Sequence, residues 1–215
     1  MLAKTAVPSR DQLGAALRIG WIVPSALGPT DQEIRERSLE TLLTIGVEPN
    51  PVTIPDGENL FEIFSTIQAS EAYAHHVNDV ARGADTIDKE VLLRLKVGAE
   101  MLAWEYIEAN KWRQKFRRYV SSLFDTYDLV ALPTVPTIAP KIDQRELIIG
   151  RVSVEVRSAL LSLTSPWNFS GTPALSVPCG MLNGLPIGLQ LVAPSGREAL
   201  LFSVAHQIER KQTHC

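Results

Sequence analysis

Cysteine is scarce in this sequence, and its scarcity excludes whole classes of protein. The 215 residues include 2 cysteines, Cys179 within an apolar run and Cys215 at the carboxyl end. Two thiols are too few for a disulfide framework or for a cysteine-rich metal site. This usage favours a protein of the reducing cytoplasm, where disulfides are rare.

Excess positive charge and long hydrophobic runs are also missing. The formal net charge is −3, so there is no overall basic field that would attract a nucleic acid or an anionic membrane. No apolar run approaches the ~20 residues needed to cross a bilayer, and residues 1–10 lack the apolar core of a signal peptide. We therefore expect a cytoplasmic protein that has neither a nucleic-acid partner nor a membrane partner.

The chain is long enough for one sizeable hydrophobic core. Its hydrophobic content of 45% is ordinary for a globular protein, and no flexible linker or internal repeat divides the sequence. Residues 1–215 are therefore expected to form a single domain. Within it, residues 1–16 are polar, contain Pro8 and Gly14, and are expected to be irregular.

The first eighty residues predict a strand, a helix, a second strand and a second helix. Thr30, followed three residues later by Glu33, matches a capping box that begins a helix, and Gly46 supplies its stop. The four segments, in order, are residues 17–23, 30–46, 52–54 and 60–81.

The remaining residues continue this alternation, which predicts an α/β protein with a mixed sheet. The apolar run 129–132 is typical of a strand that is covered on both faces. Asn183-Gly184 predicts a tight hairpin turn with positive φ. The other expected segments are helical residues 89–123 with an interruption near 98, a loop at 134–151, a helix at 154–163, paired strands at 174–179 and 187–192, and a helix at 198–209.

Three stretches of the second half carry a recognisable pattern. They are Asp128-Leu-Val-Ala-Leu-Pro-Thr134, then Thr164-Ser-Pro-Trp-Asn168 continuing through Gly171-Thr-Pro-Ala174 to Ser176-Val-Pro-Cys-Gly180, and finally Gly184-Leu-Pro-Ile-Gly-Leu-Gln190. In order and spacing they resemble the amidase-signature family, which includes simple amidases, urea-derivative hydrolases and the amidase subunits of tRNA-dependent amidotransferases. The resemblance spans nearly the whole chain. It implies the C-terminal part of the amidase-signature fold, a mixed β-sheet flanked by helices.

The catalytic segment of that family has no counterpart in this sequence. The resemblance implies a Ser–Ser–Lys triad in a Gly/Ser-rich tract that precedes the strand at residues 17–23. Such a serine needs a neighbouring base and backbone N–H groups that stabilise the oxyanion. The Ser-Gly pair in Phe169-Ser-Gly-Thr172 belongs to the C-terminal motif. We therefore expect no catalytic residue in the chain, no turnover by the chain alone, and a carboxamide or urea-type substrate for the completed enzyme.

Thr164 and Asn168 are the candidate site residues. Polar side chains between an apolar helix and an apolar strand either bind neighbouring backbone groups or serve a ligand. The resemblance implies the second role, as part of the wall of the substrate pocket. It also implies an acidic residue three before Thr164 in subunits that use glutamine, where it holds the substrate ammonium. Leu161 stands there instead, which favours the simple amidases over the glutamine amidotransferases.

Other chemistries have weaker support in the sequence. Glu71 and His75 lie four apart on a helix but lack a recognisable third metal ligand, and Cys179 has no neighbouring base. We therefore expect no metal site and no cofactor. The basic cluster of the helix at 89–123 favours a solvated face over a phosphate site; its residues are Lys111, Arg113, Lys115, Arg117 and Arg118.

A second hypothesis is a non-enzymatic binding or assembly module that retains the amidase half-fold. Both hypotheses predict a partner, because the strand at 129–132 must be covered on both faces. The expected partners are a second copy of the chain or a missing N-terminal amidase half. A small amide is expected to bind as substrate only in the completed enzyme.

Overall fold

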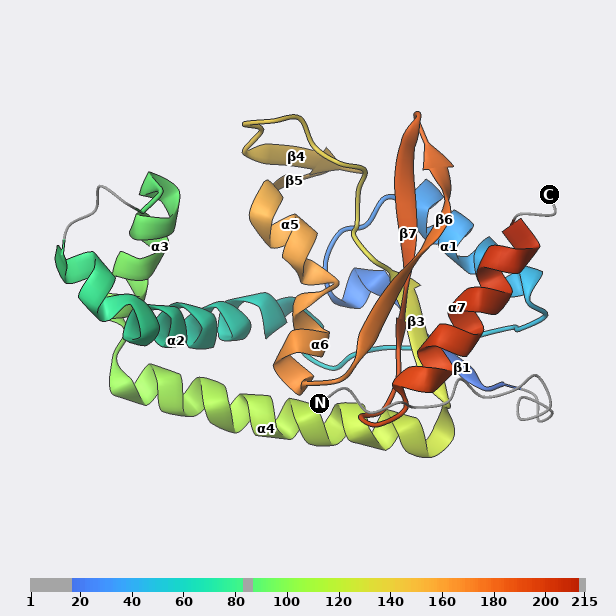
Figure 1. Cartoon of the computed structure of the whole chain (residues 1–215), viewed down its shortest axis with the longest axis horizontal. Helices are drawn as coiled ribbons and strands as arrows, with labels where there is room; N and C mark the ends of the chain where they lie inside the picture. The colour runs from blue at the N-terminus through green and yellow to red at the C-terminus, as the bar shows by residue number, and fades with distance from the viewer. Residues whose placement is uncertain (1–16, 83–86, 213–215) are drawn as a thin grey trace.

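A five-stranded mixed sheet forms the centre of the protein (Figure 1). The computed structural model describes residues 17–82 and 87–212, so the segment 1–16 and Cys215 lie outside the described residues. The strand order is β2-β1-β3-β7-β6, in which β1 pairs parallel with β2 and β3 while β7 pairs antiparallel with β3 and β6. The strands are β1 (Ile19–Ile22), β2 (Asn50–Val52), β3 (Leu129–Pro133), β6 (Ala174–Leu182) and β7 (Leu185–Val192). The predicted α/β class with a mixed sheet is confirmed.

Helices cover both faces of the sheet, as the uninterrupted apolar sequence of β3 requires. Leu129 and Ala131 of β3 belong to the hydrophobic core beneath α1 and α7. Val130 and Leu132 point to the opposite core, which α2, α4 and α6 cover. Figure 1 shows α1 and α7 on one side of the sheet and α2 and α6 on the other, with α4 running along its lower end. The helices are α1 (Gln32–Thr44), α2 (Leu60–Arg82), α4 (Ala103–Thr126), α6 (Ser165–Ser170) and α7 (Glu198–Gln212).

An ion pair ties the starts of the two central parallel strands together. The Arg18 backbone N–H donates to Oδ2 of Asp128 at 2.9 Å, and Arg18 Nη2 donates to Oδ1 at 3.0 Å. The Arg18 guanidinium, through this hydrogen bond, holds the pKa of the Asp128 carboxyl below its ordinary value. The two residues are 110 positions apart in the sequence, so the contact fixes a long-range pairing.

Helix α1 begins one residue later than the capping-box pattern predicts. Its N-cap is Asp31, whose carboxylate accepts hydrogen bonds from the backbone N–H groups of Glu33 and Ile34 at 2.9 and 3.4 Å. Thr30 instead donates to the Gly28 carbonyl at 3.4 Å. A carboxylate at the N-cap satisfies the free donors of the first turn, so Asp31 takes the place assigned to Thr30.

The segment at 134–151 is not the continuous loop expected from its prolines. Residues Glu146–Ile149 form β4 and Val152–Glu155 form β5, which pair antiparallel around a turn at Gly150. Leu147 and Ile149 pack on Ala159 of α5 (Val156–Ser162) in a small separate core. The helix therefore begins two residues later than the 154–163 segment predicted, after Glu155, whose carboxylate caps it.

The hairpin turn predicted at Asn183-Gly184 is confirmed. Asn183 has φ of 52° and Gly184 has φ of 79°, and the flanking residues Leu182 and Leu185 face each other in the register of β6 and β7. This pair of positive angles matches the two-residue turns whose twist suits antiparallel strands.

Gly98 allows helix α3 (Lys89–Glu100) to lie unusually close to α2. A Cβ atom at Gly98 would stand 2.1 Å from the Ala69 carbonyl oxygen and 2.9 Å from the Tyr73 Cβ. The predicted interruption of the 89–123 helical stretch falls just after it, between α3 and α4. Short 3₁₀ turns at Pro24–Ala26 and Gly57–Asn59 complete the described elements. Within residues 17–82 and 87–212, no helix combines the length and apolar character that a membrane span needs.

Candidate functional site

The candidate site is a cavity of about 830 Å³ between α2, α3, α5 and the start of α4. A volume of this size suits a small organic ligand. Three consecutive helices and the more distant α5 supply its wall, so the cavity exists only in the folded protein. The lining residues are Glu62, Ser65, Thr66, Gln68, Ala69, Ala72, Val91, Arg94, Leu95, Val97, Met101, Glu105, Arg157 and Leu161.

Arg157 is the best-positioned charge in this wall. Its Nη2 donates to Oε1 of Gln68 at 2.8 Å, and its Cζ lies 5.7 Å from the centre of the Phe61 ring. The side chain is therefore fixed from two directions by α2, through a hydrogen bond and a cation–π contact. Its other guanidinium N–H groups have no partner among the described residues, which leaves donors for a ligand.

Ser65 adds an unsatisfied hydroxyl to the same stretch of α2. Its Oγ is buried and has no hydrogen-bond partner among the described residues. A buried polar atom without a partner costs about 1–3 kcal/mol, and among the described residues Ser165 Oγ, which is not part of this lining, is in the same state. Phe61, Ser65 and Gln68 follow one another at steps of four and three along one face of the helix.

The rest of the wall is largely apolar. Leu95 is buried, and Met101 and Leu161 are half-buried beside it. The one carboxylate of α4 in the lining, Glu105, accepts a hydrogen bond from the Leu102 backbone N–H at 2.8 Å and so caps that helix. The cavity therefore combines an apolar body with a fixed cation at one side.

Thr164 is the N-cap of α6 and Asn168 lies within that helix, and neither is among the residues that line the cavity. The Thr164 hydroxyl donates weakly to the carbonyl groups of Leu160 and Leu161 at 3.5 and 3.4 Å. The Asn168 side chain is exposed and forms no hydrogen bond with the described residues. Their assignment to the pocket wall stays a prediction, whereas Leu161, three residues before Thr164, lines the cavity directly.

Two side chains whose contacts the sequence did not predict hold α6 and the residues before it in place. Gln190 of β7 donates to the Leu163 carbonyl at 2.9 Å, and Arg113 of α4 donates to the Phe169 carbonyl at 3.0 Å. Arg113 is thus a structural contact rather than part of a wholly solvated basic face. Gln190 was detectable as the buried polar residue in an apolar strand, which must find a partner.

The alternative chemistries find little geometric support. His76 Nδ1 lies 3.1 Å from Asp79 Oδ2, and Glu71 accepts a hydrogen bond from the Tyr106 hydroxyl at 3.2 Å. Among residues 17–82 and 87–212, no group of three or more His, Cys, Asp and Glu side chains is arranged for a metal ion. Burial raises the pKa of the Cys179 thiol, which disfavours the nucleophilic thiolate.

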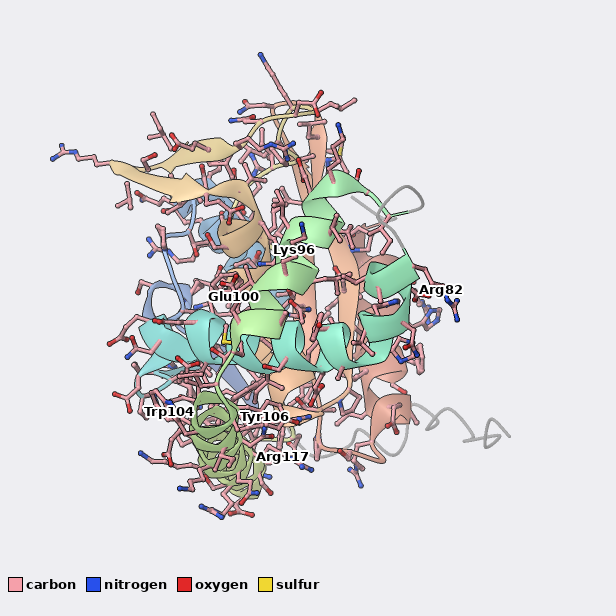
Figure 2. All side chains as sticks on the ribbon, turned by 90° about the vertical axis from the view of Figure 1, so that its left-hand side faces the viewer. Arg82, Lys96, Glu100, Trp104, Tyr106 and Arg117 are labelled. Carbon is pink, nitrogen blue, oxygen red and sulfur yellow. The ribbon has the colours of Figure 1, made fainter. Side chains whose placement is uncertain are left out.

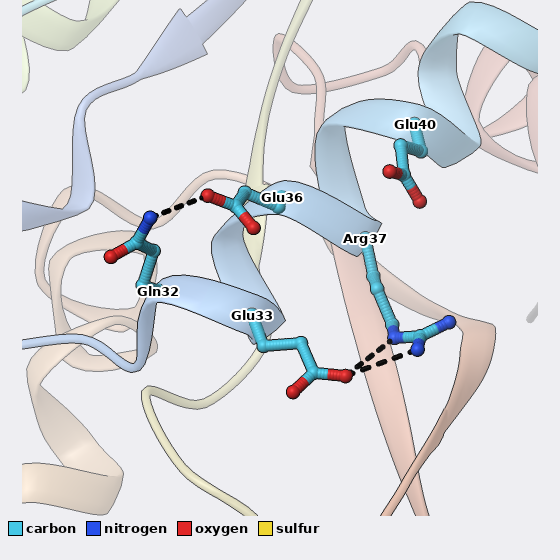
Figure 3. Close-up of a pocket in the computed structure, with 5 residues that line it drawn as sticks. All are labelled: Gln32, Glu33, Glu36, Arg37 and Glu40. Carbon is cyan, nitrogen blue, oxygen red and sulfur yellow. Dashed lines mark hydrogen bonds and ion pairs between the residues drawn. The ribbon is translucent and has the colours of Figure 1, made fainter.

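A second, shallower hollow lies along the outer face of α1. Figure 3 shows that Gln32 pairs with Glu36 and Glu33 with Arg37. Gln32 donates to Glu36 at 2.7 Å, and the Arg37 Nη2 donates to Glu33 at 3.0 Å. All of the lining residues, which include Glu40, belong to this one helix. The hollow brings no separate elements together, so the larger cavity is the better candidate.

An exposed apolar surface lies around the junction of α3 and α4. Figure 2 looks onto this end of the protein, with Trp104 at the start of α4 and Lys96 and Glu100 on α3. Trp104 is 61% exposed, a large fraction for a side chain of this size. The other exposed apolar residues of the two helices are Val91, Leu93, Val97, Leu102 and Ile107.

The chain matches the amidase family over residues 4–202. It is 30% identical over 198 residues to a glutamyl-tRNA(Gln) amidotransferase subunit from Staphylococcus epidermidis, and the alignment covers 81% of this chain and 40% of that protein. A solved amidase has a TM-score of 0.83 at 23% identity, covering 90% of this chain and 45% of its own.

A further solved structure comes from a vestigial protein complex that bears on the evolutionary origins of an s-triazine catabolic enzyme. Its TM-score is 0.82 at 26% identity, covering 92% of this chain and 43% of that chain. In this structure, as in the curated relatives, the match is confined to part of the longer chain. The chain spans about two fifths of the length of the curated relatives it matches.

Proposed function

This chain belongs to the amidase family, and on that premise we propose that it forms the substrate-binding wall and scaffold of a hydrolase acting on carboxamide or urea-type C–N bonds. The observation that carries the proposal is the 830 Å³ cavity, because its lining includes Leu161, three residues before Thr164 of the family motif. In this proposal Thr164 and Asn168 extend the wall beyond Leu161. Residues 1–215 act as one domain of a cytoplasmic enzyme.

The nucleophile and its base come from polypeptide outside the described residues. Among residues 17–82 and 87–212, the hydrogen bonds of serine hydroxyls are to carbonyl, hydroxyl or thiol groups, and none is to a lysine or a histidine. Examples are Ser170, which bonds to the Trp167 carbonyl and the Thr172 hydroxyl, and Ser176, which bonds to Thr134. A serine without a base is a weak nucleophile. The chain alone is therefore expected not to hydrolyse an amide.

The side chain of Leu161 favours a substrate without an ammonium group near it. A leucine can contact an apolar substituent, but it cannot neutralise a positive charge that has left water. Leu161→Asp would place a carboxylate in the same wall. The variant is expected to weaken binding of apolar amides and to improve binding of amides that carry an amino group.

An activity assay tests whether this chain needs a nucleophile from another polypeptide. Purified residues 1–215, incubated with a panel of carboxamides and ureas, are expected to release no ammonia. Co-production with a polypeptide that carries the Gly/Ser-rich segment, sought first in the reading frames beside this gene, is expected to give turnover. The matched control replaces the nucleophilic serine of that polypeptide with alanine. Turnover by residues 1–215 alone, abolished by one internal serine substitution, would contradict the proposal.

The exposed surface around Trp104 favours a second candidate, a non-enzymatic binding or assembly module. Apolar patches of this kind are typical of interaction sites. On this hypothesis the chain binds a second copy or another polypeptide, and no completed enzyme is formed. Sedimentation of the native chain and of Trp104→Lys distinguishes the two functions. The module hypothesis predicts that the native chain forms a stable complex, that Trp104→Lys does not, and that the mixture with the Gly/Ser-rich polypeptide gives no turnover.

A further inference from the structure

Arg157 is held ready for an anion before any ligand binds. It reaches from α5 across to α2, where Gln68 accepts a hydrogen bond at 2.8 Å and the Phe61 ring lies 5.7 Å from its Cζ. Ser65 lies between these two contacts along the helix, so the guanidinium spans the turn that carries the unsatisfied hydroxyl. An arginine fixed in this way loses little conformational freedom when it binds a planar, two-oxygen anion.

The acidic groups of the cavity do not cancel this cation. Glu105 is committed to the start of α4 through the Leu102 backbone N–H. Glu62 lies on an exposed position of α2, where solvent screens its charge. Arg94 of α3 also belongs to the lining, but it is exposed like Glu62, so solvent screens its charge as well. Of the charged groups in the lining that are fixed and half-buried, Glu105 is already satisfied by a backbone N–H, whereas Arg157 keeps donors without a partner among the described residues, and this free donor capacity favours an anion.

The apolar half of the cavity determines what else the ligand contains. Leu161 lies one helical turn after Arg157 on α5, and Leu95 and Met101 face it from the α3 side. A ligand whose charge reaches Arg157 must therefore place its remaining atoms against hydrocarbon. A fully polar anion would leave this surface without a partner.

We propose that the cavity binds small molecules that carry a carboxylate attached to an apolar body, with Arg157 as the anchor of the carboxylate and Ser65 as a supporting donor. The inference rests on the proposed function in one respect, that this ligand is the amide substrate. The substrate class then is an amide or urea that bears a carboxylate separated from the scissile bond by an apolar spacer.

Binding, rather than turnover, tests the inference on residues 1–215 without a completed enzyme. The probes are 4-phenylbutyrate, 4-phenylbutanamide and 4-phenylbutylamine, which share one body and differ in charge. Calorimetric titration is expected to give binding of the carboxylate at least tenfold tighter than of the amide, and no measurable binding of the amine. Arg157→Gln is expected to weaken carboxylate binding by tenfold to a hundredfold, on the order of the loss of one charge-assisted contact. Arg118→Gln, on the exposed part of α4, is the matched control and should bind like the native chain.

A measurement on the native chain protects the test against a variant that fails to fold. Addition of 4-phenylbutyrate should shift the Arg157 Nε–H resonance in a ¹⁵N-correlated NMR spectrum, whereas the amine should not. Equal affinity for acid and amide, preference for the amine, or no binding of any probe would each overturn the inference. Those outcomes leave the ammonia-release assay of the complemented enzyme unaffected, so failure here and failure of the proposed function are distinguishable.

Discussion

Replacing Gly98 with alanine tests whether the close approach of α3 and α2 shapes the cavity. In a solvent-exposed helix the change would stabilise the protein by about 1 kcal/mol, because alanine has the higher helix propensity. Here the new Cβ would lie 2.1 Å from the Ala69 carbonyl oxygen, and a backbone atom cannot rotate away. To reach even 3.0 Å, α3 must move by about 0.9 Å, the difference between the two distances.

That displacement has a cost that exceeds the gain in helix propensity. Overpacking of a well-filled contact costs about 1–3 kcal/mol, and Leu95, which is 4% exposed, would lose part of its burial. With the helix gain subtracted from the upper half of this range, we expect Gly98→Ala to destabilise the protein by about 1–2 kcal/mol. It should also weaken 4-phenylbutyrate binding, since α3 forms one wall of the cavity.

Urea unfolding followed by tryptophan fluorescence measures this change as a lower midpoint at unchanged slope. The control is Ala99→Gly, at an exposed position of the same helix, which is expected to lose up to about 1 kcal/mol through propensity alone. A Gly98→Ala variant that is more stable than the native chain, with unaltered probe binding, would refute the reasoning.

Three further predictions follow from contacts in the sheet. Gly184→Val should destabilise the protein by about 1–2 kcal/mol in thermal unfolding, because a β-branched residue must then adopt a φ of 79°; an unchanged melting temperature would contradict it. Asp128→Asn should lower stability by up to about 1 kcal/mol near neutral pH. Because Arg18 lowers the folded-state pKa of Asp128, this difference should be full above the ordinary carboxyl pKa of about 3.9 and should close as the pH falls through the lower folded value. A gap that does not begin to narrow as the pH falls below about 3.9 would show that the charge is not responsible. In a Cys215→Ser background, Cys179 should react with a thiol reagent only as fast as the protein unfolds, since its thiol is buried with a raised pKa; rapid labelling of the native state would contradict this.

Local patterns were sufficient to predict the central elements of the fold. Consecutive residues encode both the uninterrupted apolar run of β3 and the Asn183-Gly184 turn, so no knowledge of the tertiary structure was needed. The hairpin of β4 and β5, whose strands are as long as β1, was missed because the prolines and mixed charge of residues 134–151 favour a loop. Such short strands depend on packing against α5, a contact that sequence spacing does not reveal.

The candidate cavity was less accessible to prediction than the fold. Leu161 was singled out because the family motif fixed its position relative to Thr164. Arg157 was not singled out, because its role depends on two residues that are distant in the sequence. Gln68 is 89 positions away and Phe61 is 96 positions away. No periodicity within α5 indicates which residue of α2 it will meet.

The pairing of β1 with β3 has a consequence for how the chain folds. Arg18 and Asp128 are 110 positions apart, and the intervening residues include α1, β2, α2, α3 and α4. Closing so long a loop has an entropic cost that local helical contacts do not offset until those helices have docked. During synthesis, β1 therefore cannot pair with β3 until β3 has left the ribosome. Strand β7, the antiparallel partner of β3, follows some sixty residues later, since residue 189 pairs with 133 and residue 192 with 130. Until β3 pairs with it, β1 has unpaired backbone N–H and C=O groups along one edge, which makes this interval the period when a growing chain is most exposed to aggregation.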